Sequence, residues 1–175
     1  MSSPDFTIRP ARPGEAPILT ELCIRSKAHW GYDSGFMAAA ARLLRIREAQ
    51  IGAGGVLTAR LESGGPPCGV AVIVPLRRPG WCELSHLFVA PERLGLGIGR
   101  ALFQAATALA AESGATRISI LSDPNAAAFY EKRGARRCGE APSSVAPDRM
   151  LPLFEFAITP GEVEPEPGCP EPGVR

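Results

Sequence analysis

The stretch that most constrains the fold runs from Leu84 to Leu102 and reads LSHLFVAPERLGLGIGRAL. A strand-like apolar run ends at Ala90, and Pro91 breaks it. A short turn with glycines at positions 95, 97 and 99 follows, and apolar residues then recur at helical spacing, at Ile98, Leu102, Ala105 and Leu109. The sequence therefore predicts a strand that enters a glycine-rich turn, and a helix that begins in that turn.

The start of such a helix is suited to binding an anion. Its first N–H groups have no partner within the helix and carry a partial positive charge, and glycines let a ligand approach them closely. Arg100 stands where a dinucleotide fingerprint needs its third glycine, and no Gly-Lys-Ser/Thr follows as in a nucleotide P-loop. The turn is therefore predicted to hold the phosphate of some other ligand.

The segment VAPERLGLGIGRAL resembles the pyrophosphate loop of the GNAT N-acetyltransferases, which bind acetyl-coenzyme A. That family usually has Gln/Arg-x-x-Gly-x-Gly/Ala, which Gly97 and Gly99 fit, whereas Leu94 occupies the Gln/Arg position and Arg93 lies one residue early. The resemblance implies that acetyl-coenzyme A is bound by the loop residues Arg93, Leu94, Gly95, Leu96, Gly97, Ile98, Gly99 and Arg100.

A second segment, SDPNAAAFYEKRGA at residues 122–135, resembles the family's helix with a tyrosine near its end. The resemblance implies that Tyr130 contacts the cofactor and donates a proton to the departing thiolate, which would ease its departure. The alternative is a tyrosine packed against the core. The family's cofactor-contacting Asn lies seven residues before the tyrosine. That position is Asp123 here, and Asn125 either takes over the contact or caps the helix.

The strand at residues 81–89 carries the candidate base. Alternation places Glu83, Ser85 and Leu87 on one face and Leu84, His86 and Phe88 on the other. In GNAT proteins the end of this strand splays from its neighbour and binds the pantetheine arm through main-chain groups, which the resemblance assigns to Leu87, Phe88 and Val89.

Glu83 lies eleven residues before Leu94, the spacing at which protein-lysine acetylating members place their general base. A base is needed because an amine near pH 7 is mostly protonated. His86 is the rival base, and each of the two side chains could instead have only a structural role.

The acceptor pocket is predicted at RSKAHWGY, residues 25–32. Together with Arg149-Met-Leu-Pro152, this segment resembles an uncharacterised bacterial group of GNAT proteins with RSKAxWGY and RxLP segments. We expect Lys27, Trp30, Tyr32 and His86 to contact the acceptor. The alternative is that the aromatic side chains only pack a helix end against the sheet.

The order of patterns predicts an α/β fold with a mixed central sheet and helices on both faces, as the GNAT resemblance also implies. One expected helix spans residues 34–50. We expect one GNAT acetyltransferase domain at residues 1–159. Residues 160–175 hold five prolines and four glutamates without an apolar pattern, and are predicted to form a disordered tail.

Composition narrows the class of protein. A net charge of +1 argues against a nucleic-acid partner, and no apolar run is long enough to cross a membrane. Five scattered cysteines without CxxC pairs favour reduced thiols over a zinc site, so no metal is expected. The first residues do not resemble a signal peptide, so a cytoplasmic location is expected. A homodimer is left open.

These patterns lead to one functional prediction, an N-acetyltransferase that moves an acetyl group from acetyl-coenzyme A to a primary amine by direct attack. The acceptor could be a small molecule or a protein amine. An acyl-enzyme route through Cys82 is a weaker competitor, because no paired histidine is evident, although alternation puts Cys82 and His86 on one face. A non-catalytic acyl-coenzyme A sensor is the alternative of a different class.

Overall fold

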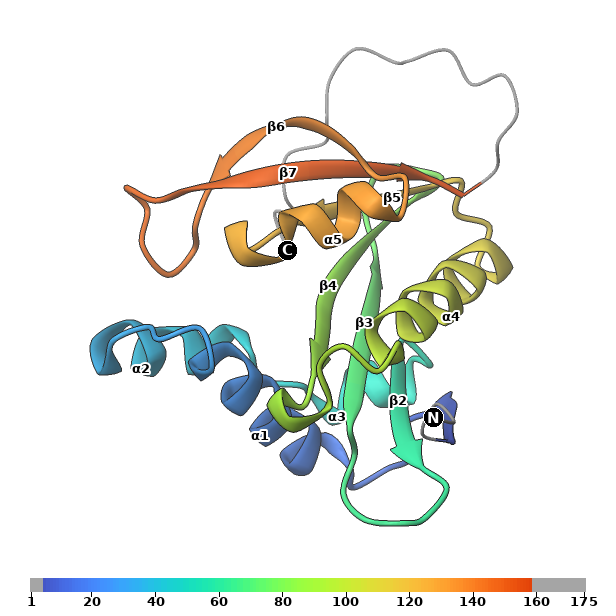
Figure 1. The fold of residues 1–175 in the computed structure, drawn as a ribbon. Coiled ribbons are helices and arrows are strands. Elements are labelled where there is room, and N and C mark those ends of the chain that lie inside the picture. The colour runs from blue at the N-terminus through green and yellow to red at the C-terminus, as the bar shows by residue number, and fades with distance from the viewer. Residues whose placement is uncertain (1–4, 159–175) are drawn as a thin grey trace.

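The computed structural model describes residues 5–158, and the predicted tail at 160–175 lies outside this range. Within it the chain forms a seven-stranded sheet in the order β1-β2-β3-β4-β5-β7-β6 (Figure 1). The strands are β1 (Phe6–Pro10), β2 (Val56–Leu61), β3 (Gly69–Pro75), β4 (Trp81–Val89), β5 (Arg117–Leu121), β6 (Arg136–Pro142) and β7 (Met150–Ala157). The helices are α1 (Ala16–Ala28), α2 (Ser34–Leu43), α3 (Glu48–Gly52), α4 (Ile98–Glu112) and α5 (Ala127–Lys132), with 3-10 turns η1 (Pro91–Arg93) and η2 (Pro124–Ala126).

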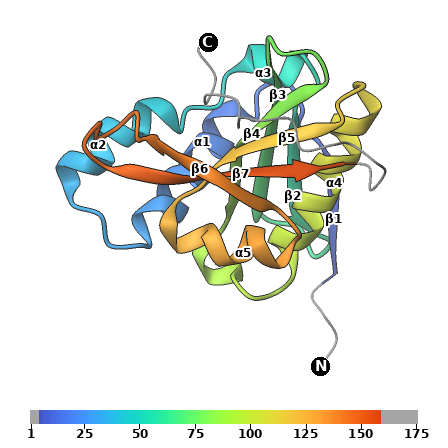
Figure 2. The ribbon, with the colours of Figure 1, turned by 90° about the horizontal axis from the view of Figure 1, so that it is seen from above.

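The sheet is mixed and covered on both faces, which confirms the predicted fold class. Strands β4 and β5 run parallel, and every other neighbouring pair is antiparallel. One apolar core lies between the sheet and α4, and a second lies between the opposite face and the helices α1 to α3. Figures 1 and 2 show α4 and α1 on opposite sides of the sheet.

Helix α4 lies unusually close to β3 at Gly69. A Cβ atom at this position would lie 2.6 Å from the Leu102 side chain and 2.9 Å from that of Ile98. Only glycine therefore permits this approach of helix and strand, which fixes the first two turns of α4 against the sheet. The glycine-rich turn that precedes α4 is held in place as a result.

A β-bulge interrupts β4 at Ser85 and corrects the predicted alternation. His86 lies opposite Val72 and Leu84 lies opposite Ile73, so Ser85 has no opposite residue on β3. A bulge shifts the alternation of side chains by one position. Leu84 and Leu87 therefore both face the core under α4.

Glu83 and His86 consequently share a face, contrary to the sequence-based prediction. Glu83 lies opposite Val74 and His86 opposite Val72, and both valines belong to the core beneath α1. Cys82 lies on the α4 side and not with His86.

The predicted helix at residues 34–50 is wrong as a single element. The structure has two helices, α2 and α3, separated by residues 44–47. At the break, the buried Ile46 donates its N–H to the Thr20 hydroxyl at 3.0 Å, and Arg47 is extended. The side chain of Gln50 accepts the Arg47 N–H at 2.9 Å and starts the second helix.

The cysteines depart in part from the expectation of reduced thiols. Cys23, Cys68 and Cys82 are free and buried. Cys138 is disulfide-bonded. Cysteine spacing in the sequence does not report which thiols meet in space.

No helix among residues 5–158 is long and apolar enough to cross a membrane.

Candidate functional site

The turn between β4 and α4 presents a run of unpaired main-chain donors. Within the described chain, the N–H groups of residues 95 to 100 donate to no backbone or side-chain acceptor, and Ala101 is the first to bond, to the Gly97 carbonyl at 3.0 Å. Residues 94–97 are exposed to solvent. Helix α4 has neither a side-chain cap nor an acidic residue in its first turn. This end of α4 can therefore hold an anionic group.

Gly95 and Gly97 are required by the backbone of this turn. Their φ angles are +80° and +84°, a left-handed conformation that other residues adopt only at a cost. Gly99, in contrast, is helical, and a Cβ there would lie 3.5 Å from Val89 and 3.6 Å from Phe129, in ordinary contact distance. Two of the three glycines of the motif are thus needed for the geometry of the turn.

The strands β4 and β5 pair over only a short part of their length. Residues 81–83 pair with residues 117–119, whereas β3 pairs with β4 as far as Val89. The β5-facing main-chain groups of Leu87, Phe88 and Val89 therefore have no strand partner, and these three side chains are half-buried. The predicted splay of β4 from its neighbour is present, and it leaves a main-chain edge that an extended, amide-containing ligand can line.

Tyr130 is buried on α5 among aromatic rings. Its ring lies 6.1 Å from Phe103, 5.2 Å from Phe129 and 6.1 Å from Phe154. In the described residues its hydroxyl has no hydrogen-bond partner. Burial, and secondly the nearby charge of Asp123, raise the pKa of Tyr130, so the phenol stays protonated at neutral pH and can donate a proton.

The Asp123 carboxylate connects the segment at residues 25–32 with the segment at residues 122–135. Its Oδ2 atom accepts hydrogen bonds from Lys27 Nζ at 2.5 Å and from the Tyr32 hydroxyl at 2.7 Å. Its Oδ1 atom accepts from the main chain and the side chain of Asn125, at 3.0 and 2.9 Å. Burial opposes ionisation, but the hydrogen bonds from Lys27 and Tyr32 outweigh it, so the pKa of Asp123 is lowered.

Asp123 and Asn125 lie together in this network, because the Asp123 carboxylate accepts hydrogen bonds from Lys27, Tyr32 and Asn125. The contact of Asp123 and Asn125 with the cofactor stays a prediction. Lys27 and Tyr32 do come together, at the point where α1 and the loop before α2 meet the end of β5.

Arg149 belongs to the same cluster of hydrogen-bonded side chains as Lys27, Tyr32, Asp123 and Asn125. The sequence alone predicts no role for it. Its Nη2 atom donates to the Tyr32 hydroxyl at 2.7 Å. Its guanidinium carbon lies 4.9 Å from the centre of the Tyr32 ring and 5.4 Å from that of Phe36, and the two rings are stacked at 4.5 Å. The co-occurrence of RSKAHWGY with RMLP was the available signal, because Tyr32 and Arg149 are its contacting members.

Trp30 and His86 lie outside this cluster. Trp30 is 47% exposed, and its ring contacts His29 edge-on at 5.6 Å. His86 is buried, with its Nδ1 atom 3.0 Å from the Ser85 hydroxyl and its ring 6.0 Å from Phe88. Glu83 is half-buried and lies across from Ser119 on β5, where β4 and β5 are still paired.

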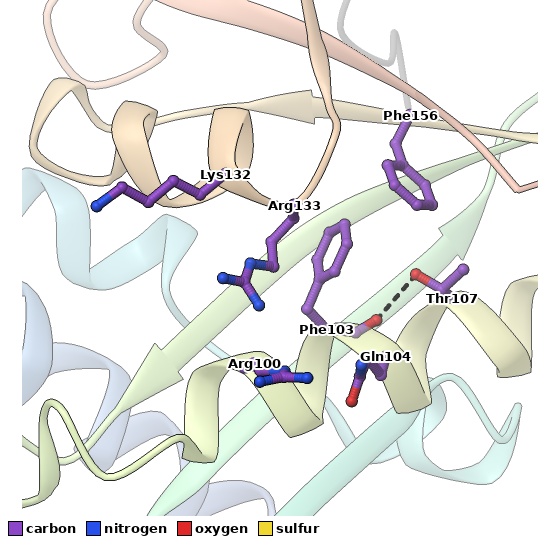
Figure 3. Close-up of a pocket in the computed structure, with 7 residues that line it drawn as sticks. All are labelled: Arg100, Phe103, Gln104, Thr107, Lys132, Arg133 and Phe156. Carbon is purple, nitrogen blue, oxygen red and sulfur yellow. Dashed lines mark hydrogen bonds between the residues drawn. The ribbon is translucent and has the colours of Figure 1, made fainter.

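A cavity of about 350 Å³ lies between α4 and α5, beside the glycine-rich turn. Figure 3 shows Arg133 reaching from the end of α5 toward α4, where Arg100 lies. None of the three cations at this cavity, Arg100, Lys132 and Arg133, forms an ion pair within residues 5–158, and the buried Nε of Arg133 has no hydrogen-bond partner there. The cavity is lined by Arg100, Phe103, Gln104, Thr107, Lys132, Arg133 and Phe156.

Lys132 and Arg133 belong to the segment at residues 122–135, whose resemblance to the family implies no role for either. Their position one helical turn or less beyond the buried Tyr130 was the available signal. No group of three or more His, Cys, Asp or Glu side chains in the described part of the chain could hold a metal ion.

Comparison with known proteins agrees with this geometry. The sequence model of the Acetyltransferase (GNAT) family matches residues 26–135. No curated protein matches the sequence.

Solved structures share the fold at low identity. A GCN5-related N-acetyltransferase from Rhodopseudomonas palustris is 24% identical with a TM-score of 0.67, over 90% of this chain and 98% of the other. The PaiA N-acetyltransferase from Thermoplasma acidophilum, in complex with coenzyme A, is 17% identical with a TM-score of 0.68, over 87% and 99%. A GNAT family acetyltransferase from Brucella melitensis, in complex with acetyl-CoA, is 20% identical with a TM-score of 0.62, over 91% and 92%.

Proposed function

The chain belongs to the GNAT family of acetyltransferases, and on that premise we propose that it transfers an acetyl group from acetyl-coenzyme A to a primary amine by direct attack. The observation that carries the proposal is that three features follow one another along the chain: the Glu83 carboxylate and a free main-chain edge on β4, and a run of free N–H groups in the turn between β4 and α4.

The residues present fit coenzyme A. Its pyrophosphate is matched by the N–H groups of residues 95–100, and its amide-containing arm by the free edge of β4 at residues 87–89. Arg100, Lys132 and Arg133 supply the charge to bind a further phosphate at the cavity between α4 and α5. Two structural neighbours bind coenzyme A or acetyl-CoA, in keeping with this assignment.

In the proposed reaction, Glu83 removes a proton from the ammonium group of the acceptor, directly or through water. The amine nitrogen then forms a bond to the acetyl carbonyl carbon, the bond between that carbon and sulfur breaks, and the nitrogen loses its second proton to water, from which Tyr130 regains a proton after the thiol has left. Tyr130 gives its proton to the leaving thiolate, and its raised pKa keeps the phenol protonated until then. His86, on the same face as Glu83, is retained as the rival base.

The bulge at Ser85 disfavours the acyl-enzyme route through Cys82. Cys82 is 2% exposed on the α4 side of the sheet, and His86 lies on the other side. Burial also raises the pKa of the Cys82 thiol, which reduces the fraction present as the reactive thiolate. A nucleophilic cysteine needs the opposite conditions.

The test is the release of free coenzyme A thiol from acetyl-coenzyme A in the presence of a panel of amines. We expect release to require both the protein and an amine, with the acetylated amine detected by mass spectrometry. Release at the same rate without any amine would contradict direct transfer. Binding of coenzyme A with no transfer to any amine would favour the sensor alternative.

A further inference from the structure

Arg149 is held in one orientation by aromatic rings. It is the last residue of the turn at residues 143–149, directly before β7. Its N–H donates to the Ala146 carbonyl and its carbonyl accepts from the Ser143 N–H, both at 2.8 Å. Its guanidinium carbon lies 4.9 Å from the centre of the Tyr32 ring and 5.4 Å from that of Phe36, so the cation rests against the two rings. The cation is thus positioned before any ligand arrives.

The charge of Arg149 is not balanced within its cluster. Lys27 is paired with Asp123, whereas the Arg149 side chain makes one hydrogen bond, to the neutral Tyr32 hydroxyl, and no ion pair within residues 5–158. A guanidinium has five N–H donors, so most of those on Arg149 remain to be satisfied by water or a ligand. Arg149 is only partly exposed, so this charge is not simply that of a solvated surface arginine.

Arg149 lies near the proposed reaction centre. It is two hydrogen bonds from Asp123, through the Tyr32 hydroxyl. Asp123 in turn lies close enough to Tyr130 for its charge to act on that phenol. Lys27, which completes the cluster, is on α1, and α1 covers the face of β4 on which Glu83 lies.

We propose that Arg149 binds a carboxylate of the acceptor, so that the acceptor is an amino acid or another amino carboxylate. The inference rests on the proposed function and deepens it by naming the acceptor class. The acceptor ammonium is directed to Glu83 and its carboxylate to the guanidinium edge of Arg149, which can bind both oxygens at once. Arg149 provides one guanidinium, and the charge of the neighbouring Lys27 is already paired with Asp123. One guanidinium suits a carboxylate better than a phosphate, which commonly needs further cations.

The test compares acids with their own amides. Acetyl transfer is measured for L-α-amino acids and for the series from glycine to aminohexanoate, each beside its carboxamide. The wild-type protein should prefer the acid of at least one pair by roughly 10- to 100-fold in kcat/KM, as expected for a charge-assisted hydrogen bond. Arg149→Gln should abolish that preference by lowering kcat/KM for the acid, with the value for the carboxamide nearly unchanged.

Controls separate recognition from a structural role. Arg137→Gln removes an exposed arginine from β6, close to β7, and should keep the preference for the acid. If Arg149 only supports Tyr32, its substitution will lower the rates for acid and carboxamide by the same factor, which overturns the proposal. Equal use of acids and carboxamides by the wild-type protein overturns it too, while leaving the transferase function intact.

If no amine is acetylated, a binding measurement tests whether Arg149 binds a carboxylate. The coenzyme A-bound protein is titrated with N-acetyl amino acids and with their carboxamides, and the melting temperature is recorded. A rise with the acids in the wild-type protein, lost in Arg149→Gln, would support the carboxylate site even though the transferase proposal failed. No rise with any acid would overturn the site.

Discussion

Lys27 and Asp123 are 96 residues apart in the sequence, yet Lys27 Nζ lies 2.5 Å from Asp123 Oδ2. The pair joins α1 to the segment that leads into the helix of Tyr130, and both side chains are about one-sixth exposed. The Tyr32 hydroxyl adds a second donor to the same carboxylate oxygen. The position of the acceptor side relative to the proposed acid Tyr130 therefore depends on this ion pair.

Replacing Lys27 with Met should destabilise the protein at pH 7. The variant leaves the partly buried Asp123 charge without its cation, at a cost of about 1 to 3 kcal/mol. Arg42→Met, which removes an exposed cation from α2, should cost little. Urea unfolding of the two variants measures the difference, and equal stability of Lys27→Met and wild type at pH 7 would contradict the role of the pair.

The cost of Lys27→Met should also depend on pH. The pKa of Asp123 is lowered in the folded protein from the ordinary value of 3.8, so its stabilising contribution is present above that pH. The contribution is lost as the pH falls through the lower, folded pKa. The stability difference between wild type and Lys27→Met should therefore shrink below about pH 4.

Gly97 and Gly114 form a matched pair for testing the anion site. Both have φ angles near +85°, at the two ends of α4, and a Cβ atom at either would meet nothing within 4 Å. An alanine at either position should cost about 1 to 2 kcal/mol through backbone strain. Only Gly97→Ala should also weaken coenzyme A binding, because the free N–H groups surround Gly97 and not Gly114.

The readout is the rise in melting temperature with coenzyme A. At 100 times the dissociation constant, a ligand adds about 2.7 kcal/mol of stability. Gly114→Ala should keep the full rise and Gly97→Ala should lose most of it, whereas NAD should give none in any of the proteins. Equal rises in the two variants would remove the turn from the binding site.

Tyr130→Phe tests the proposed general acid. The change keeps the ring that packs against Phe103, Phe129 and Phe154 and removes only the hydroxyl. Turnover should fall about 100- to 10,000-fold, as is typical of general-acid catalysis, with little change in coenzyme A affinity. Unchanged turnover, with chemistry shown to be rate-limiting, would remove Tyr130 from the mechanism.

The sequence predicted the elements whose signals are local. The strand predicted at residues 81–89 is β4, and α4 begins in the glycine-rich turn as predicted. The break between α2 and α3 was missed, because Leu43, Leu44 and Ile46 look like a continuing helical face. The break depends on the hydroxyl of Thr20 from another helix, which no local pattern records.

The parts of the candidate site that were predicted also have local signals in the sequence. The glycine-rich turn and the splayed strand follow from motifs that are contiguous in the sequence. The bulge at Ser85 depends on how β4 pairs with β3, and the role of Arg149 depends on contacts with Tyr32, 117 residues away. Both features depend on tertiary contacts, and both change which side chains we propose for the acceptor site.

The bulge makes the identity of the base the sharpest remaining test, because Glu83 and His86 share a face. Glu83→Gln keeps the size of the side chain but cannot accept a proton. At neutral pH it should lower the rate about 100- to 10,000-fold, the usual contribution of a general base. Raising the pH should recover part of the rate, since more of the amine is then already deprotonated. His86→Gln should keep the wild-type response to pH. The opposite result, with Glu83→Gln unchanged and His86→Gln impaired at neutral pH and rescued at high pH, would assign the base to the histidine.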